Sequence, residues 1–140
     1  MSTEAIKHGH CLCGAIQITA PEASPEVGAC HCRMCRRWGG GPFMEIPCGT
    51  NVSIDGQEHL RVFDSSEWGE RGFCGRCGTH LFYRIKETGQ HMVPVGLFEQ
   101  DAGLVFSNQV FIEEKPAYYE FANPTLNMTG AELFAKIQKP

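Results

Sequence analysis

Seven of the eight cysteines fall into three tight clusters whose spacing is typical of metal ligands: Cys11–Cys13, Cys30–Cys35 and Cys74–Cys77. Each i,i+2 or i,i+3 pair supplies two thiolates from one short stretch of backbone. Four thiolates close a tetrahedral zinc site, whereas three protein ligands leave a position open for water or substrate. Seven clustered cysteines therefore predict two Zn²⁺ per chain, one structural and one with an open face.

Two other uses of cysteine compete with zinc. An even count suits a disulfide framework in a short secreted chain, but residues 1–5 show no feature of an export signal. A bridge between Cys11 and Cys13, or between Cys30 and Cys32, would also close a very small strained loop. A reducing compartment keeps thiols free for metals, so we expect a cytoplasmic protein. Iron–sulfur ligation is a third alternative.

The composition indicates one domain over residues 1–140, large enough for a real core. No apolar run is long enough to span a bilayer, so no membrane partner is expected. The formal charge of −4 would become about −7 once seven ligating thiolates and two Zn²⁺ are counted. Such an acidic surface attracts nucleic acid poorly, so no nucleic-acid partner is expected either.

The apolar pattern has mostly period two, which predicts a β-dominated sandwich or folded sheet. A hairpin loop is predicted at 86–90. Helix is predicted in only two places: one turn from Met34 to Trp38, and a C-terminal helix with a capping box at Thr129 and Glu132. Leu133, Phe134 and Ile137 would form the apolar face of that second helix. The predicted strands are Ala15–Ala20, Leu60–Phe63, Leu81–Ile85, His91–Val95 and Gln109–Ile112.

Spacing alone leaves the pairing of the clusters open. Cys74 and Cys77 form a zinc knuckle whose glycines permit a tight turn, and the knuckle needs two more ligands. Cys11-Leu12-Cys13 could provide them, because an i,i+2 pair on a strand points both thiolates to one side. Cys32 and Cys35 would equally complete a zinc-ribbon pattern with the knuckle.

The middle cluster supplies three thiolates, from Cys30, Cys32 and Cys35. A structural site would recruit a fourth ligand, for which Cys48, His31, His80 or an aspartate are the candidates. Without one, the fourth position is open to a thiol, water or carbonyl oxygen. Three thiolates make zinc a weak Lewis acid, so the site suits thiolate activation better than water activation.

Several neighbours of the middle cluster have two interpretations. His31 is either a hydrogen-bonded structural histidine or an acid–base group. The patch of Arg33, Arg36 and Arg37 is either a solvated face or a clamp for the carboxylate of an anionic thiol. Trp38 and Phe43 flank a glycine loop and are either core or pocket border. Cys48 stands alone, which favours a buried small residue over a ligand.

These motifs resemble the glutathione-dependent formaldehyde-activating (GFA) family. The resemblance runs in order from about residue 7 to residue 122, and its motifs are specific as a fold assignment. It rests on four segments, Gly9–Ala15, Cys30–Arg37 with Gly40 and Phe43 after it, Ser65–Leu81, and Val110–Pro116.

The resemblance implies an Mss4-like fold of β-sheets folded around zinc. By the family pattern, Cys11, Cys13, Cys74 and Cys77 hold the structural zinc, and Cys30, Cys32 and Cys35 hold the catalytic-type zinc. The implied reaction adds glutathione to formaldehyde and gives S-hydroxymethylglutathione, formally a carbon–sulfur lyase run in reverse.

The working hypothesis is therefore a zinc-assisted addition of a small-molecule thiol to an aldehyde, with Arg36 and Arg37 as candidate substrate-binding residues and His31 as the first acid–base group to test. Holding both reactants together would be the main contribution. The alternative is a non-catalytic Mss4-like zinc module that acts as a binding or chaperone-like surface. An open fourth metal position favours the enzyme, and a blocked one favours the module.

Overall fold

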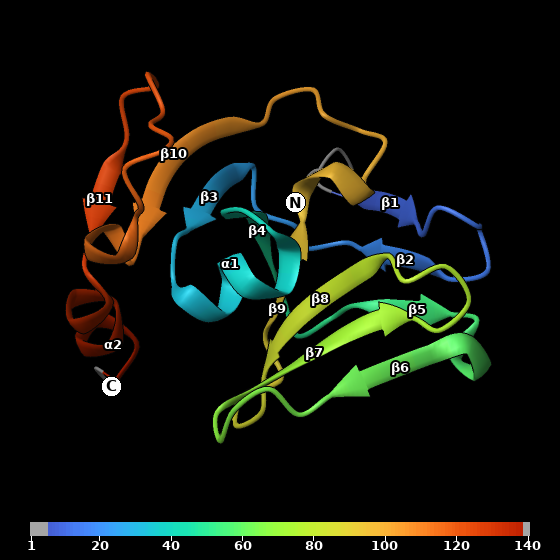
Figure 1. The fold of residues 1–140 in the computed structure, drawn as a ribbon. Coiled ribbons are helices and arrows are strands. Elements are labelled where there is room, and N and C mark those ends of the chain that lie inside the picture. The colour runs from blue at the N-terminus through green and yellow to red at the C-terminus, as the bar shows by residue number, and fades with distance from the viewer. Residues whose placement is uncertain (1–5, 139–140) are drawn as a thin grey trace. The chain divides into compact units, whose positions relative to one another are not determined.

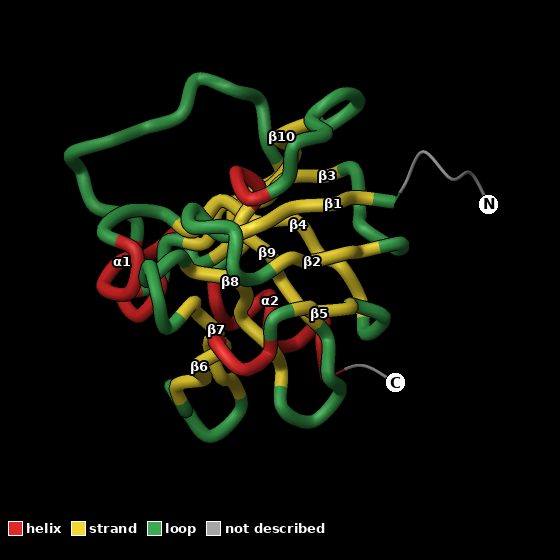
Figure 2. Tube along the Cα trace, turned by 90° about the vertical axis from the view of Figure 1, so that its right-hand side faces the viewer, coloured by secondary structure: helices red, strands yellow, loops and turns green. Residues whose placement is uncertain are grey.

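The computed structural model describes the backbone of residues 6–138 and the side chains of residues 6–136. Strands predominate, and short helices connect or follow them (Figures 1 and 2). The predicted mainly β fold with a short C-terminal helix is confirmed. The expectation on export depended on residues 1–5, which lie outside the described residues. No helix between residues 6 and 138 is long and apolar enough to cross a membrane.

The chain forms two compact units, which are described separately. The first comprises residues 1–25 and 46–103, and the second comprises residues 26–45 and 104–140. The strand β4 (Phe43–Gly49) begins in the second unit and ends in the first. A single domain over the whole chain remains a prediction.

The first unit contains antiparallel strands. One set lies in the order β1–β2–β5, with bounds Lys7–His10, Gln17–Ala20 and Ser53–Asp55. The other lies in the order β9–β8–β7–β6, with bounds His91–Pro94, His80–Ile85, Gly69–Cys74 and Leu60–Phe63. Two short 3-10 helices, Gln57–His59 and Val95–Leu97, belong to the same unit. The predicted hairpin at 86–90 is confirmed, since the Ile85 amide donates to the Gln90 carbonyl at 2.9 Å.

Burial explains the strands that the alternating pattern predicted. Ile16, Ile18 and Ala20 are at most 1% exposed, whereas Gln17 between them is exposed, so β2 turns its apolar side inward. Leu81 and Val93 are fully buried in β8 and β9. These side chains supply the core that holds the turns after β1 and β7 in place.

The second unit is a mixed sheet in the order β11–β10–β3–β4, where β3 is Glu26–Cys30, β10 is Val105–Val110 and β11 is Leu126–Met128. The pairs β3–β10 and β10–β11 are parallel, and β3–β4 is antiparallel. The predicted strand Gln109–Ile112 ends early, at Val110. Its end coincides with Phe111, which takes the left-handed conformation with φ 55°, and a 3-10 helix follows from Ile112 to Glu114.

Two α-helices complete this unit: α1 (Arg33–Gly39) and α2 (Gly130–Gln138). Both contain the predicted helical segments. The capping box of α2 is confirmed, because the Thr129 amide donates to Glu132 Oε1 at 2.8 Å and the Glu132 amide donates to Thr129 Oγ1 at 3.1 Å. Phe134 packs edge-on against Phe111, with ring centroids 5.9 Å apart. The side chain of Ile137 lies outside the described residues.

Candidate metal centres

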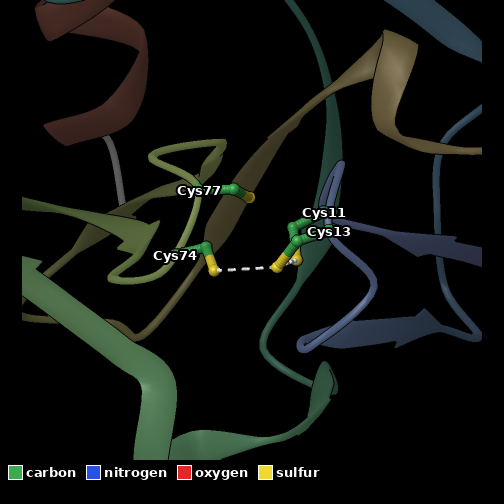
Figure 3. A group of neighbouring side chains, drawn as sticks. All are labelled: Cys11, Cys13, Cys74 and Cys77. Carbon is green, nitrogen blue, oxygen red and sulfur yellow. Dashed lines mark hydrogen bonds between the residues drawn. The ribbon is translucent and has the colours of Figure 1, made fainter.

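In the structure the clustered cysteines form two groups of sulfur atoms, which are called the first and the second cluster from here on. The first cluster gathers four sulfur atoms from two turns of the first unit (Figure 3). Every Sγ of Cys11, Cys13, Cys74 and Cys77 lies within 4.8 Å of the others. The Sγ–Sγ distance is 3.6 Å between Cys11 and Cys13 and 3.8 Å between Cys13 and Cys74. Tetrahedral zinc with bonds of about 2.3 Å to sulfur requires about 3.8 Å between its ligands. The donor set therefore fits Zn²⁺.

The turn after β1 positions Cys11 and Cys13. The expectation that this pair lies on a strand is wrong, because β1 ends at His10. The Cys11 amide donates to the Ile16 carbonyl at 3.0 Å, and the Ile16 amide donates to Cys11 Sγ at 3.3 Å. An amide that donates to sulfur favours the thiolate form that a metal requires.

The turn after β7 forms the knuckle at Cys74 and Cys77. The Arg76 amide points at Cys74 Sγ, 3.4 Å away, and the Gly78 amide donates to the Cys74 carbonyl at 2.8 Å. Gly78 has φ +81°, in the left-handed region where a side chain would be strained. Glycine at this position thus lets the chain reverse tightly enough to return Cys77 to the site.

Electrostatics within the first cluster call for a cation. Hydrogen bonds from the Thr79 hydroxyl and amide lower the pKa of Cys77 to about 5. A hydrogen bond from the Ala15 amide lowers the pKa of Cys13, but burial and hydrogen bonds to the other three thiols outweigh it and raise this pKa to about 11. Ionising one thiol therefore makes ionisation of its neighbour harder. A divalent cation removes this conflict, because it offsets the negative charges of the thiolates.

The second cluster lies in the second unit, where β3 meets α1. The Sγ atoms of Cys30, Cys32 and Cys35 lie within 4.8 Å of one another, and those of Cys30 and Cys35 are 3.4 Å apart. Cys32 is the N-cap of α1, and its Sγ accepts from the Cys35 amide at 3.3 Å. The Arg33 amide donates to Glu114 Oε1 at 2.8 Å, which ties the start of the helix to the 3-10 helix.

The thiol of Cys30 resists ionisation more strongly than those of the first cluster. Hydrogen bonds to the thiols of Cys32 and Cys35, followed by burial, raise its pKa well above the ordinary range. Three thiolates can therefore share this place only around a cation. Among the described residues, this group has three candidate ligands, and no fourth side chain joins it.

None of the eight cysteines, all of which lie within the described residues, forms a disulfide, which contradicts the disulfide framework. The sulfur atoms within each cluster stand apart by far more than the length of about 2.05 Å that a disulfide bond requires. Cys48 is fully buried and belongs to neither group, as expected for a small core residue.

His31 is fully buried, and both of its ring nitrogens are engaged. Nε2 lies 2.7 Å from Gln109 Oε1, and Nδ1 lies 2.8 Å from the Tyr119 hydroxyl. Burial lowers the pKa of His31, so the ring is neutral at neutral pH. Because the amide oxygen of Gln109 only accepts, Nε2 carries the proton and Nδ1 accepts from Tyr119. This arrangement favours the structural interpretation, and an acid–base role for His31 stays a prediction.

The three arginines of the basic patch differ in burial and in their contacts. Arg36 is half-buried, and its Nε donates to the His31 carbonyl at 2.9 Å, whereas Arg33 and Arg37 are exposed. Trp38 and Phe43 are both half-buried. The structure thus anchors Arg36 beside the second cluster and leaves Arg37 at the surface of α1. Their role in substrate binding stays a prediction.

Sequence reasoning missed the partners that hold the two sites. Thr79 hydrogen-bonds to Cys77 Sγ at 3.1 Å and accepts from the Leu12 amide at 3.1 Å, so it links both turns of the first cluster. A hydroxyl residue two positions after a cysteine pair is a signal that could have found it. Gln109 and Tyr119 come from distant segments, and nothing in their local sequence marks them as partners of His31.

Comparison with known proteins shows to which family the chain belongs. A protein of Schizosaccharomyces pombe named as an uncharacterised lyase is 36% identical over 132 residues, covering 94% of this chain and 96% of its own. A putative glutathione-dependent formaldehyde-activating enzyme of Halomonas elongata is 30% identical over 84 residues, 53% of each chain.

A crystal structure of a Rhodobacter sphaeroides protein shares the fold. It has a TM-score of 0.54 at 23% identity and covers 66% of this chain and 87% of its own. The family model described as "glutathione-dependent formaldehyde-activating enzyme" matches residues 6–114, which include both cysteine clusters. The chain therefore belongs to the family of glutathione-dependent formaldehyde-activating enzymes.

Proposed function

We propose that this protein is a zinc-dependent enzyme of the carbon–sulfur lyase type that adds glutathione to formaldehyde and gives S-hydroxymethylglutathione. The membership in the family and the names of the two relatives support a formaldehyde-activating or lyase role. In the reaction the thiol sulfur bonds to the aldehyde carbon, and the aldehyde oxygen gains a proton.

The observation that carries the proposal is the three-sulfur group of Cys30, Cys32 and Cys35. Zinc bound by three thiolates would have one position for an exogenous thiol, and its chemistry there is to lower the pKa of that thiol. The four-sulfur group around Cys74 and Cys77 has no such position, so its proposed role is to hold the two turns of the first unit together.

The remaining residues would bind and orient the thiol. The hydrogen bond from Arg36 Nε to the His31 carbonyl fixes the guanidinium plane, and the two Nη groups suit a carboxylate of glutathione. The exposed Arg37, one residue further along α1, would provide a second charge for the tripeptide. Holding thiol and aldehyde in contact is the main source of rate, because it replaces a bimolecular encounter.

The test is exchange spectroscopy with ¹³C-formaldehyde and glutathione, which measures the rate of interconversion between the aldehyde and the adduct. We expect the holoprotein to accelerate exchange above the uncatalysed rate, Cys35→Ala to abolish the acceleration, and Cys48→Ala to retain it. Cys48 is the matched control because it is a buried cysteine outside both groups.

The same experiment distinguishes the enzyme from the non-catalytic alternative. If the protein carries two Zn²⁺ and binds glutathione without accelerating exchange, the module interpretation replaces the enzyme. If exchange is accelerated equally by wild type and Cys35→Ala, the second cluster is not the site.

A further inference from the structure

Glu45 on β4 has one carboxyl oxygen, Oε2, that is shielded from solvent and has no hydrogen-bond partner among residues 6–136. The residue as a whole is half-buried, so the shielding is shown for Oε2 and not for the whole side chain. Burying an unpaired carboxylate is costly, so the group stays protonated instead. Burial raises the pKa of Glu45 to about 8.

The strand register puts this acid on the same face as the second cluster. In the antiparallel pair β3–β4, Glu45 is opposite Gly28 and Phe43 is opposite Cys30. Opposite residues share a face and alternate residues along a strand return to it, so Glu45 and Cys30 point to the same side. The backbones of diagonal neighbours of this kind are about 7–8 Å apart, so long side chains can reach across to each other. A small substrate could therefore contact both Glu45 and the proposed metal ligand Cys30.

The surroundings on that face explain why the acid has no counter-charge. Gly28 has no side chain, and Asn108 of β10 occupies the space beside it, since a Cβ on Gly28 would be within 2.6 Å of Asn108 Oδ1. Asn108 Nδ2 donates to Ser107 Oγ at 3.1 Å. The titratable residues of β3 on this face are Glu26, which accepts from Ser107 at 2.7 Å, and Cys30. Neither would favour a negative charge on Glu45.

We propose that Glu45 is the general acid of the second site and donates its proton to the aldehyde oxygen as the thiolate adds to the carbon. This role rests on the proposed function. The S–C bond forms, the C=O π pair becomes a lone pair on oxygen, and the O–H bond of the carboxyl breaks as its proton moves to that oxygen. The thiol has already released its own proton to solvent, and the Glu45 carboxylate regains one from solvent.

An acid at this place would neutralise the negative charge that develops during the reaction. Attack by a thiolate moves negative charge onto the aldehyde oxygen, and a neutral carboxylic acid can donate a proton to that oxygen. A general acid works best when its pKa is near the operating pH. A surface glutamate, with an ordinary pKa of about 4.3, is already ionised at neutral pH and has no proton to donate. His31, by contrast, already uses both of its ring nitrogens.

The experiment compares wild type, Glu45→Gln and the control Glu26→Gln, which changes an exposed glutamate two positions from Gly28 on the same strand face. We expect Glu45→Gln to lower the catalysed exchange rate about 100-fold and Glu26→Gln to leave it unchanged. The ratio of the wild-type rate to the Glu45→Gln rate should decrease as pH rises through about 8, because the wild-type acid is lost there.

Two readouts besides activity accompany the rates. In wild type, ¹³C NMR of labelled glutamate carboxyls should show one group titrating near pH 8 that is absent in Glu45→Gln. The zinc content and the glutathione-induced rise in melting temperature should be the same in all three proteins.

The outcomes separate the two proposals. Full activity of Glu45→Gln with an unchanged pH profile would overturn the acid role and leave the proposed function in place. No catalysed exchange in wild type that binds zinc and glutathione would overturn the proposed function, and the acid role with it. A Glu45 carboxyl that titrates near pH 4 to 5 would overturn the acid role whatever the rates are.

Discussion

At the scale of single residues, the two groups of thiols differ in the number of ligands that they offer to a metal ion. Cys11, Cys13, Cys74 and Cys77 form a complete four-sulfur set, whereas Cys30, Cys32 and Cys35 form a set of three. A complete set contributes folding free energy when metal binds, because it joins segments about 60 residues apart. A set of three lies within six residues and closes only a short loop.

Loss of one ligand should therefore have unequal effects at the two sites. Cys77→Ala should lose one Zn²⁺ and most of the folded structure of the first unit, whereas Cys35→Ala should lose the other Zn²⁺ and remain folded. Elemental analysis and circular dichroism check this, with Cys48→Ala as the control. Equal solubility and equal folding of the two variants would contradict the division of labour.

The buried acid of Glu45 should make stability depend on pH. The folded state holds its proton up to about pH 8, while the unfolded chain releases it above about 4.5. Between these values the unfolded state binds fewer protons, so stability falls as pH rises. Glu45→Gln removes this loss, and its stability advantage over wild type should grow by about 2–3 kcal/mol between pH 6 and pH 8.

Urea denaturation of the zinc-loaded proteins at the two pH values measures this difference. Glu26→Gln is the control, because its carboxylate is exposed and already accepts a hydrogen bond from Ser107. An equal response of wild type and Glu45→Gln to pH would show that the carboxyl is not neutral in the folded state.

At the scale of elements, the turn after β7 depends on backbone conformation. Gly78→Ala should destabilise the first unit by about 1–2 kcal/mol, since the site has open space but a φ of +81° that costs an alanine this amount. Gly96→Ala is the matched control, because it also meets open space but has no positive φ. Thermal melts and zinc retention against a chelator measure the effect, and equal melts of the two variants would exclude it.

The capping box of α2 offers a second test at this scale. Thr129→Ala removes the acceptor for the Glu132 amide and should cost about 1 kcal/mol. The loss should be local, since α2 packs through Phe134 on Phe111. Compared with wild type, Thr129→Ala should show faster hydrogen exchange in α2 and unchanged exchange in β3. Unchanged exchange in both elements would contradict the assignment of the capping box.

At the scale of the whole molecule, metal and thiol binding should both stabilise the folded state. The purified chain should carry close to two Zn²⁺, and glutathione at about 100 times its dissociation constant should add about 2.7 kcal/mol to stability. A domain of this size gains about 2–4 °C per kcal/mol, so the melting temperature should rise by about 5–10 °C. Cys35→Ala should abolish this rise, and joint replacement of Arg36 and Arg37 by Gln should reduce it.

Differential scanning calorimetry with and without glutathione measures the shift, and S-methylglutathione is the control ligand because it lacks a thiol. An equal shift by both ligands would place glutathione binding away from a metal. Absence of zinc from the purified protein would contradict the whole metal assignment.

The sequence by itself determined the class of fold and predicted which cysteines gather into candidate metal sites. Short-range spacing marks Cys30, Cys32 and Cys35 as one group, because three ligands within six residues need no distant part of the chain to meet. Period-two alternation marks β2, β8 and β9, and the Thr129–Glu132 pair marks the start of α2, since these signals act within a few residues.

Tertiary structure decided what local signals could not. Spacing left the partners of Cys74 and Cys77 open, and only the packing of two turns brings Cys11 and Cys13 to them. Strand β7 is not among the predicted strands. It contains glycine because the ring of Phe82 lies where a Cβ on Gly72 would be. Nothing in the sequence distinguishes Glu45 from other glutamates, and its pKa is raised only because the fold buries Oε2 without a hydrogen-bond partner among the described residues.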